Sequence, residues 1–367
     1  MQQEIMGTTE TIARQADARQ EEMRQGTGRR EEPALELPQD IVLFQVFDHH
    51  DRFGFPGPIY RVTGGHGGEA ILICGSRKTA LLDCGMAYCG RQTVSNLKRQ
   101  MEALGREKLD YVLLSHSHYD HIGALPYILR AYPDAEVFGS SHCARILRRH
   151  SAHALMRELG EKARDLYVPG STEEIPIDGL RVDHVLLDGD SLFLGGGGCR
   201  TEAEQIVAYE TGGHTQCSMS FLVKPLDLLF ASESTGIIES GVCSLSEGRG
   251  YIHTPILKNF NQALQSMKKC RDLHPSHLCL PHFGMVPDSF IEQYWEDFSV
   301  ECENRVRFVR QLKEAGLSDE EMLEKYADRY WTKYKAMEQP KEAFMLNSKN
   351  ILKAVLNEIE RRDQDGI

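Results

Sequence analysis

Short apolar runs, separated by glycine-rich or polar turns, fill the chain from about residue 41 to residue 280. Runs of roughly four to eight residues that are rich in Ile, Val and Leu are typical of buried strands. We therefore predict strands at residues 41–47, 59–63, 70–74, 79–82, 110–114, 135–139, 179–187, 205–210, 218–223, 227–230 and 277–280.

Segments with helical spacing lie between several of these strands. In 91–104, Val94, Leu97 and Met101 fall on one face, and Gly105 provides a stop. Similar patterns predict a helix up to about residue 132, one or two helices in 141–167, and another in 260–270. Because helices are interspersed with strands, we predict an α/β fold with helices packed outside two sheets.

The two ends of the chain differ from this central part. Residues 1–40 are polar and contain few large apolar residues, which predicts a tail or a loosely held helix rather than core. From about Asp288 the chain consists of long, charged segments with helical spacing, and Ser318 to Glu321 forms a capping-box sequence. We therefore divide the chain into a tail (1–40), a central domain (41–287) and a helical C-terminal extension (288–367). The extension could serve as a lid or as a homodimer surface.

Composition narrows the possible partners and compartments. The formal net charge is −12, and without a basic block the chain is a poor candidate for binding nucleic acid. We expect neither a signal peptide nor a membrane span, because no apolar stretch approaches the roughly 18 residues that a span needs. Ten cysteines without a CxxC pair suggest a reducing, cytoplasmic location.

Four side chains that can bind metals occur within one short stretch: His116, His118, Asp120 and His121. They follow the predicted strand at 110–114, where open α/β sheets usually place their sites. His116 and His118 are two residues apart, so both can point the same way from an extended segment. Asp120 and His121 fall where the next helix begins, so one loop can contribute to two neighbouring metal sites. The alternative is that the histidines merely cap the helix.

Three later residues stand at equivalent places after predicted strands: His214, Glu233 and His282. Imidazole and carboxylate groups suit zinc or iron. The side chains divide into two ligand sets joined by one carboxylate: His116, His118 and His214 for one metal, Asp120, His121 and His282 for the other, and Glu233 for both. Glu233 could alternatively cap a helix.

Taken together, these motifs resemble the metallo-β-lactamase superfamily. Residues 79–85, with Asp83, and 188–195 resemble two further turns of that family. The resemblance covers about 41–287 and implies an αβ/βα sandwich with a two-metal site at one edge. Glu233 stands where many members carry Asp, and Gly212 replaces a usual Pro and should loosen that turn. Since residue 118 is His rather than Glu, we do not expect the flavodiiron arrangement.

The resemblance implies a metal-dependent hydrolase. We expect a hydroxide held between two divalent metal ions, with zinc as the expected metal and iron or manganese as alternatives, to attack a small ester-like substrate. A lactone, a thioester or a phosphodiester would qualify, and Asp120 would bind metal and orient the hydroxide as the catalytic residue. A metal-binding ligand sensor with little turnover and an iron-dependent sulfur dioxygenase remain alternatives.

Other residues could shape the pocket. The helices of 141–167 and the C-terminal extension are expected to line it, although their apolar residues could simply pack against one another. Tyr251 and His253, on an expected loop, could contact substrate, although a structural role is the alternative. Cys217 and Cys279 each lie three residues from a candidate histidine, so a thiol near the site stays possible, although inert buried cysteines are commoner.

Overall fold

The computed structural model describes residues 41–43, 58–65, 67–195, 204–244, 249–282, 284–332, 335–336 and 339–366. Two six-stranded sheets form the centre of this part of the chain, and a three-stranded sheet accompanies them. The predicted tail (1–40) and the second half of the predicted strand 41–47 lie outside the described residues.

The first large sheet has the order β2-β3-β4-β5-β6-β7. Strands β4 to β7 are parallel, whereas β2 and β3 are antiparallel additions. Its strands are β2 (Ile59–Arg61), β3 (Ile71–Cys74), β4 (Thr79–Leu82), β5 (Tyr111–Leu113), β6 (Glu136–Ser140) and β7 (His184–Leu186). The strand predicted at 179–187 is thus much shorter, because Gly179, at a φ of 99°, lies in a turn before it.

The second large sheet has the order β15-β14-β11-β10-β9-β8. Both β9 and β11 are antiparallel to β10, and β11 is parallel to β14, so β9, β11 and β14 end at the same edge. This edge collects the loops that carry His214, Glu233 and His282. The strands are β8 (Ser191–Gly195), β9 (Glu204–Glu210), β10 (Met219–Lys224), β11 (Leu228–Phe230), β14 (His277–Leu280) and β15 (Gly284–Val286).

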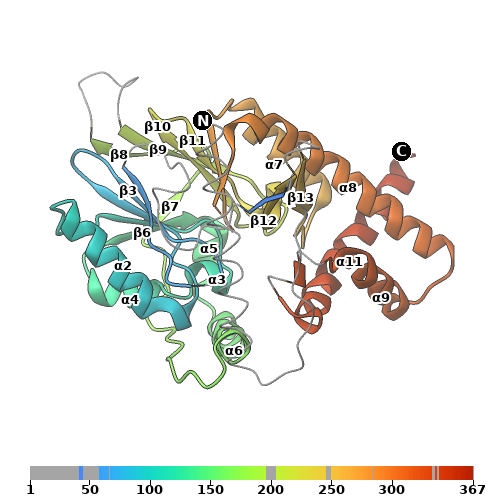
Figure 1. The fold of residues 1–367 in the computed structure, drawn as a ribbon, viewed down its shortest axis with the longest axis horizontal. Helices are drawn as coiled ribbons and strands as arrows, with labels where there is room; N and C mark the ends of the chain where they lie inside the picture. The colour runs from blue at the N-terminus through green and yellow to red at the C-terminus, as the bar shows by residue number, and fades with distance from the viewer. Residues whose placement is uncertain are drawn as a thin grey trace.

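The two sheets pack face to face with helices outside, which gives the expected αβ/βα sandwich (Figure 1). Buried side chains from both sheets, such as Leu113 and Phe221, form the central core. Helices α2 (Gly90–Ala103) and α4 (Leu125–Ala131) cover the first sheet, and α7 (Phe260–Asp272) packs on the second. The segment predicted as one or two helices contains two, α5 (Ser141–Ile146) and α6 (His150–Tyr167).

The C-terminal region is helical, as predicted: α8 (Ile291–Glu314), α9 (Asp319–Tyr330) and α11 (Lys341–Asp365). Both hydrogen bonds of the capping box between Ser318 and Glu321 are present. One apolar core continues from the second sheet through α7 and α8 to α9 and α11. Helix α8 also contacts the small sheet of β1 (Ile41–Leu43), β12 (Ile237–Ser244) and β13 (Arg249–His253) through β13.

A membrane-spanning helix would need a long apolar stretch. None of the helices in the described ranges is long and apolar enough to cross a bilayer.

Candidate metal centre

All seven side chains predicted as ligands lie in the segments that follow strands. His116 and His118 are in the loop after β5, and Asp120 and His121 are in the short helix α3 (Tyr119–Ile122) that follows. The remaining three follow the strands of the second sheet that end at a common edge: His214 after β9, Glu233 at the start of a 3-10 turn after β11, and His282 after β14. The sandwich thus brings loops from both sheets to one place.

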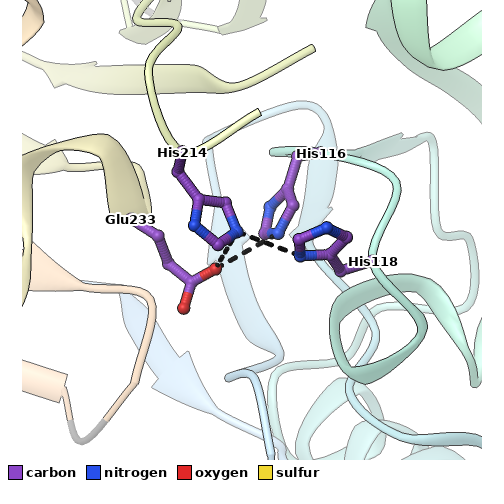
Figure 2. Close-up of side chains that lie close together, drawn as sticks. All are labelled: His116, His118, His214 and Glu233. Carbon is purple, nitrogen blue, oxygen red and sulfur yellow. Dashed lines mark hydrogen bonds and ion pairs between the residues drawn. The ribbon is translucent and has the colours of Figure 1, made fainter. Parts of the chain in front are cut away.

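Three imidazoles and one carboxylate form the first cluster: His116, His118, His214 and Glu233 (Figure 2). One possible ligand atom from each lies within 4.8 Å of the others. Nε2 of His214 lies 2.7 Å from Oε2 of Glu233, and Nε2 of His116 lies 3.3 Å from the same oxygen. Nδ1 of His118 faces Nε2 of His214 at 3.0 Å.

Asp120, His121 and His282 form a second cluster by the same criterion. Glu233 reaches this cluster as well, because its Oε1 lies 3.1 Å from Nε2 of His282 and its Oε2 lies 3.8 Å from Nε2 of His121. His116, His121, His214 and Glu233 are buried, whereas His118, Asp120 and His282 are partly exposed. These three therefore mark the open side of the centre.

Three of the histidines, His116, His121 and His214, are oriented by hydrogen bonds of their outward-facing Nδ1 atoms. Nδ1 of His121 donates to Asp83 Oδ2 at 3.0 Å, and Nδ1 of His116 donates to Ser115 Oγ at 3.0 Å. Ser115 Oγ in turn donates to Asp83 at 2.6 Å, and Nδ1 of His214 donates to the carbonyl of Pro255. Such contacts fix each tautomer and leave the other ring nitrogen free to bind a metal.

Burial and neighbouring charges set the protonation of the centre without metal. Burial, and then the imidazole of His214, lower the pKa of His118 to about 4. Burial alone would lower the pKa of His121, but the carboxylates of Asp120 and Asp83 raise it to about 10. Burial alone would raise the pKa of Glu233, but His214, His116 and His282 hold it well below its usual range. Glu233 is therefore anionic at neutral pH.

Two buried nitrogen atoms support a metal-binding role for these residues. Among the residues that the structure describes, Nε2 of His116 and Nε2 of His121 are buried without a hydrogen-bond partner. A buried polar atom left unsatisfied costs about 1–3 kcal/mol, so such atoms are rare unless something binds them. Both atoms face the carboxylate of Glu233 and their Nδ1 atoms are already bonded. This donor set fits divalent metal ions that accept nitrogen and oxygen ligands.

Asp83→Asn is expected to weaken metal binding about 10–100-fold, since Asp83 supports both His121 and Ser115. Asp83 has a φ of 51°, a conformation that asparagine also tolerates, so the change tests the carboxylate alone. Metal affinity would be measured by competition with a chromogenic chelator. The exposed Asp178 provides the control Asp178→Asn; equal affinities in the two variants would contradict the supporting role of Asp83.

Several structural features differ from the sequence interpretation or extend it. Tyr251 and His253 lie in strand β13 rather than on a loop, and His253 is buried. Cys217 and Cys279 are buried free thiols outside both clusters. The turn at Gly212 is held by a hydrogen bond from Ser266 Oγ to its carbonyl, at 2.7 Å.

Sequence reasoning also missed some of the supporting contacts. The Pro255 carbonyl that fixes His214 has no side-chain signal that could reveal it. Ser234 Oγ, which accepts a hydrogen bond from the backbone N–H of His214 at 2.9 Å, lies beside Glu233 in the sequence but far from His214. Contacts of this kind depend on how the two sheets meet.

Comparison with known proteins identifies a family and several similar proteins. Residues 63–282 match the family model of the metallo-beta-lactamase superfamily. The metallo-beta-lactamase fold-containing protein ST1585 of Sulfurisphaera tokodaii is 31% identical over 225 residues, which cover 61% of this chain and 75% of that protein. The metallo-beta-lactamase family protein TTHA1429 of Thermus thermophilus shares the fold, with a TM-score of 0.54 and 18% identity over 84% of this chain and 94% of that one.

Two shorter matches involve oxidoreductases. A coenzyme F420H(2) oxidase of Methanocaldococcus jannaschii is 34% identical over 83 residues, and a nitric oxide reductase of Moorella thermoacetica is 32% identical over 99 residues. These matches cover only 20% and 24% of those proteins.

Proposed function

Since this chain belongs to the metallo-β-lactamase superfamily, we propose that it hydrolyses a small ester-like substrate with the help of two divalent metal ions. The observation that carries this proposal is the carboxylate of Glu233, which lies between two clusters of possible ligands and contacts imidazoles of both.

In the proposed centre, His116, His118 and His214 would hold one ion, Asp120, His121 and His282 would hold the other, and Glu233 would help to hold both. When bound, two such ions would supply a nucleophile at neutral pH and electrostatic stabilisation of the negative charge that develops on the substrate oxygen. Zinc is the expected metal, because the imidazole-rich donor set suits it.

Asp120 is the proposed catalytic residue. Its Oδ2 lies 3.6 Å from Nε2 of His121 and 3.5 Å from Nε2 of His282, and its side chain is 19% exposed on the open side of the centre. From this position the carboxylate can orient the attacking water and accept its proton. The carbonyl of Asp120 accepts a hydrogen bond from the backbone N–H of Gly68 at 3.1 Å, which fixes this end of α3.

A panel of esters tests the proposal. Protein loaded with zinc, manganese or iron would be assayed with lactones, thioesters and phosphodiesters, with His118→Ala as the variant that removes one ligand. We expect one class to be turned over and the turnover to be lost in the variant. Equal turnover by the variant would contradict the proposed centre. Full metal loading without turnover of any class would instead favour a ligand sensor.

A second candidate function is redox chemistry with iron in the same ligand set. The matches to a coenzyme F420H(2) oxidase and a nitric oxide reductase favour it, although each spans a small part of those proteins. The iron content of the purified protein and its oxygen uptake with reduced sulfur compounds would distinguish this oxidoreductase from a hydrolase.

A further inference from the structure

The second cluster of the candidate metal centre takes its side chains from two separate loops. Asp120 and His121 are in α3, after β5 of the first sheet, whereas His282 follows β14 of the second sheet. Hydrogen bonds that join the two loops would fix how far apart these side chains stand. Residues 67–69, in the connection between β2 and β3, make such bonds.

Two consecutive backbone amides of the 67–69 segment reach the two loops. The N–H of Gly68 donates to the carbonyl of Asp120 at 3.1 Å, and the N–H of Glu69 donates to the carbonyl of Pro281 at 3.0 Å. Asp120 is itself a candidate ligand, and Pro281 directly precedes His282. Because consecutive residues of a chain are only about 3.8 Å apart, the segment keeps the two loops close together.

The position of Gly68 leaves no room for a side chain. A Cβ atom at Gly68 would lie 2.7 Å from Nδ1 of His121 and 2.8 Å from the carbonyl oxygen of Asp120. Both distances are well inside the separation of about 3.5–4.0 Å that is usual between nonbonded heavy atoms. The backbone of Gly68 therefore lies directly against the imidazole of His121 and limits where this ring can stand.

Buried side chains hold the 67–69 segment in place. The carboxylate of Glu69 accepts hydrogen bonds from Nε of Arg61 at 2.5 Å and from Oγ1 of Thr63 at 2.6 Å. Oγ1 of Thr63 in turn accepts from the backbone N–H of Ala70 at 2.8 Å. The side chains of Arg61 and Glu69 are both only 7% exposed. Because desolvation offsets much of the attraction in a buried ion pair, the fixed backbone at Glu69 explains this pair better than added stability does.

The side chain of Glu69 also stands near the residues that orient His121. Glu69, Asp83, Ser115 and Pro281 line the same small cavity. Asp83 accepts hydrogen bonds from both His121 and Ser115. The anchor of the 67–69 segment and the hydrogen bonds that orient His121 therefore belong to one buried region.

We propose that the 67–69 segment positions the second metal site, with Gly68 and Glu69 setting the distance between the α3 loop and the loop of His282. This role rests on the two-ion centre of the proposed function but not on the hydrolytic reaction. Gly68 and Glu69 are positioning residues, since they act through Asp120, His121 and His282. Both hydrogen bonds of the segment go to loops of the second cluster, so their loss should weaken the second ion selectively.

Gly68→Ala tests the contact with His121. The φ of Gly68 lies outside the left-handed region, so the close contact alone opposes alanine. Zinc affinity would be measured by competition with a chromogenic chelator. The second zinc ion is expected to bind about 10–100-fold more weakly than in the wild type, the usual cost of disturbing the support of metal ligands, while the first keeps its affinity. Unchanged affinity for every bound ion would overturn the proposal.

Two ligand variants assign the effect to one cluster. In His118→Ala the remaining ion should lie in the second cluster, and adding Gly68→Ala should weaken it about 10–100-fold. In His282→Ala the remaining ion should lie in the first cluster, and adding Gly68→Ala should leave its affinity unchanged. The reverse pattern would overturn the proposal.

Thr63→Val and Thr63→Ser test the anchor of Glu69. Valine has nearly the shape of threonine but lacks the hydroxyl that joins Glu69 to Ala70. We expect Thr63→Val to weaken the second ion about 2–10-fold, the typical effect of one hydrogen bond, and Thr63→Ser to restore wild-type affinity. Equal affinities in the two variants would contradict the role of Glu69. If Gly68→Ala does not fold, this pair decides alone.

Gly75→Ala is the control for steric disturbance. A Cβ atom at Gly75 would lie 2.6 Å from the carbonyl oxygen of Leu194. Gly75 is in the turn between β3 and β4, and β4 is parallel to β5, so this turn lies at the opposite edge from the centre. Gly75→Ala should lower the free energy of unfolding of the metal-free protein without changing either zinc affinity. Selective weakening of the second ion by this control as well would overturn the proposal.

These measurements separate the positioning role from the proposed function. Absence of turnover with two bound ions would contradict the hydrolytic reaction and leave the positioning role to be decided by the affinities. A wild-type protein that binds one zinc ion would contradict the two-ion centre. Weakening of that ion by Gly68→Ala would still support the positioning role, and an unchanged affinity would overturn it.

Discussion

Asp120→Asn is expected to lower kcat/KM for the hydrolysed substrate by about 10²–10⁴-fold, the usual contribution of a group that accepts a proton in the reaction. Asparagine keeps the shape of the side chain but loses the negative charge beside His121 and His282. It can neither accept the proton nor serve as an anionic ligand. Steady-state kinetics and metal content, measured on the same preparations, would show whether catalysis or metal binding is lost.

Asp134→Asn is the control for this change, because Asp134 is an exposed aspartate in a turn far from the clusters in sequence. It should leave kcat/KM unchanged. Were Asp120→Asn to retain wild-type kcat/KM with both metals bound, the catalytic role of Asp120 would be wrong, although a ligand role for the histidines would survive.

Trp295→Ala is expected to lower the free energy of unfolding by about 3–5 kcal/mol. Trp295 on α8 is fully buried in the core that joins the second sheet to the C-terminal helices. The substitution leaves a cavity at this junction, and urea denaturation followed by circular dichroism would measure the loss. Because Nε1 of Trp295 is buried and has no hydrogen-bond partner among the described residues, Trp295→Phe should cost less than Trp295→Ala.

Val300→Ala on the same helix tests whether the stability lost in Trp295→Ala comes from the burial of Trp295. Val300 is 58% exposed, so its truncation should change the free energy of unfolding by no more than about 0.5 kcal/mol. Similar losses for both alanine variants would argue against a junction core at Trp295. Two separate unfolding transitions in Trp295→Ala would show that the helices and the sandwich unfold independently.

The sequence indicated the position of a candidate residue best where that residue follows an apolar strand. His116, His118, His214, Glu233 and His282 all stand just beyond such runs, and strand direction then brings them to one edge. The C-terminal helices were predictable for a similar reason, since long charged segments with helical spacing and a capping box have few alternative structures.

The β12–β13 hairpin escaped prediction because its pattern is irregular. The register of the β12–β13 pairing shifts between Ile238 and Cys243. Such an irregularity interrupts the two-residue alternation on which strand prediction depends. The burial of Arg305 could not be predicted either. Arg305 looks like one more charge on a charged helix, and only the packing of α9 and β13 shows that it is fully buried.

The candidate metal centre connects the two large sheets, because its side chains come from loops of both. His118 and His214, whose ring nitrogens face each other, are 96 residues apart in the chain. We expect contacts between such distant residues to form late in folding, because they need both sheets to be formed and docked. Ions bound there would stabilise only the docked form and oppose separation along the seam. We therefore expect loss of bound ions to expose the seam to proteases.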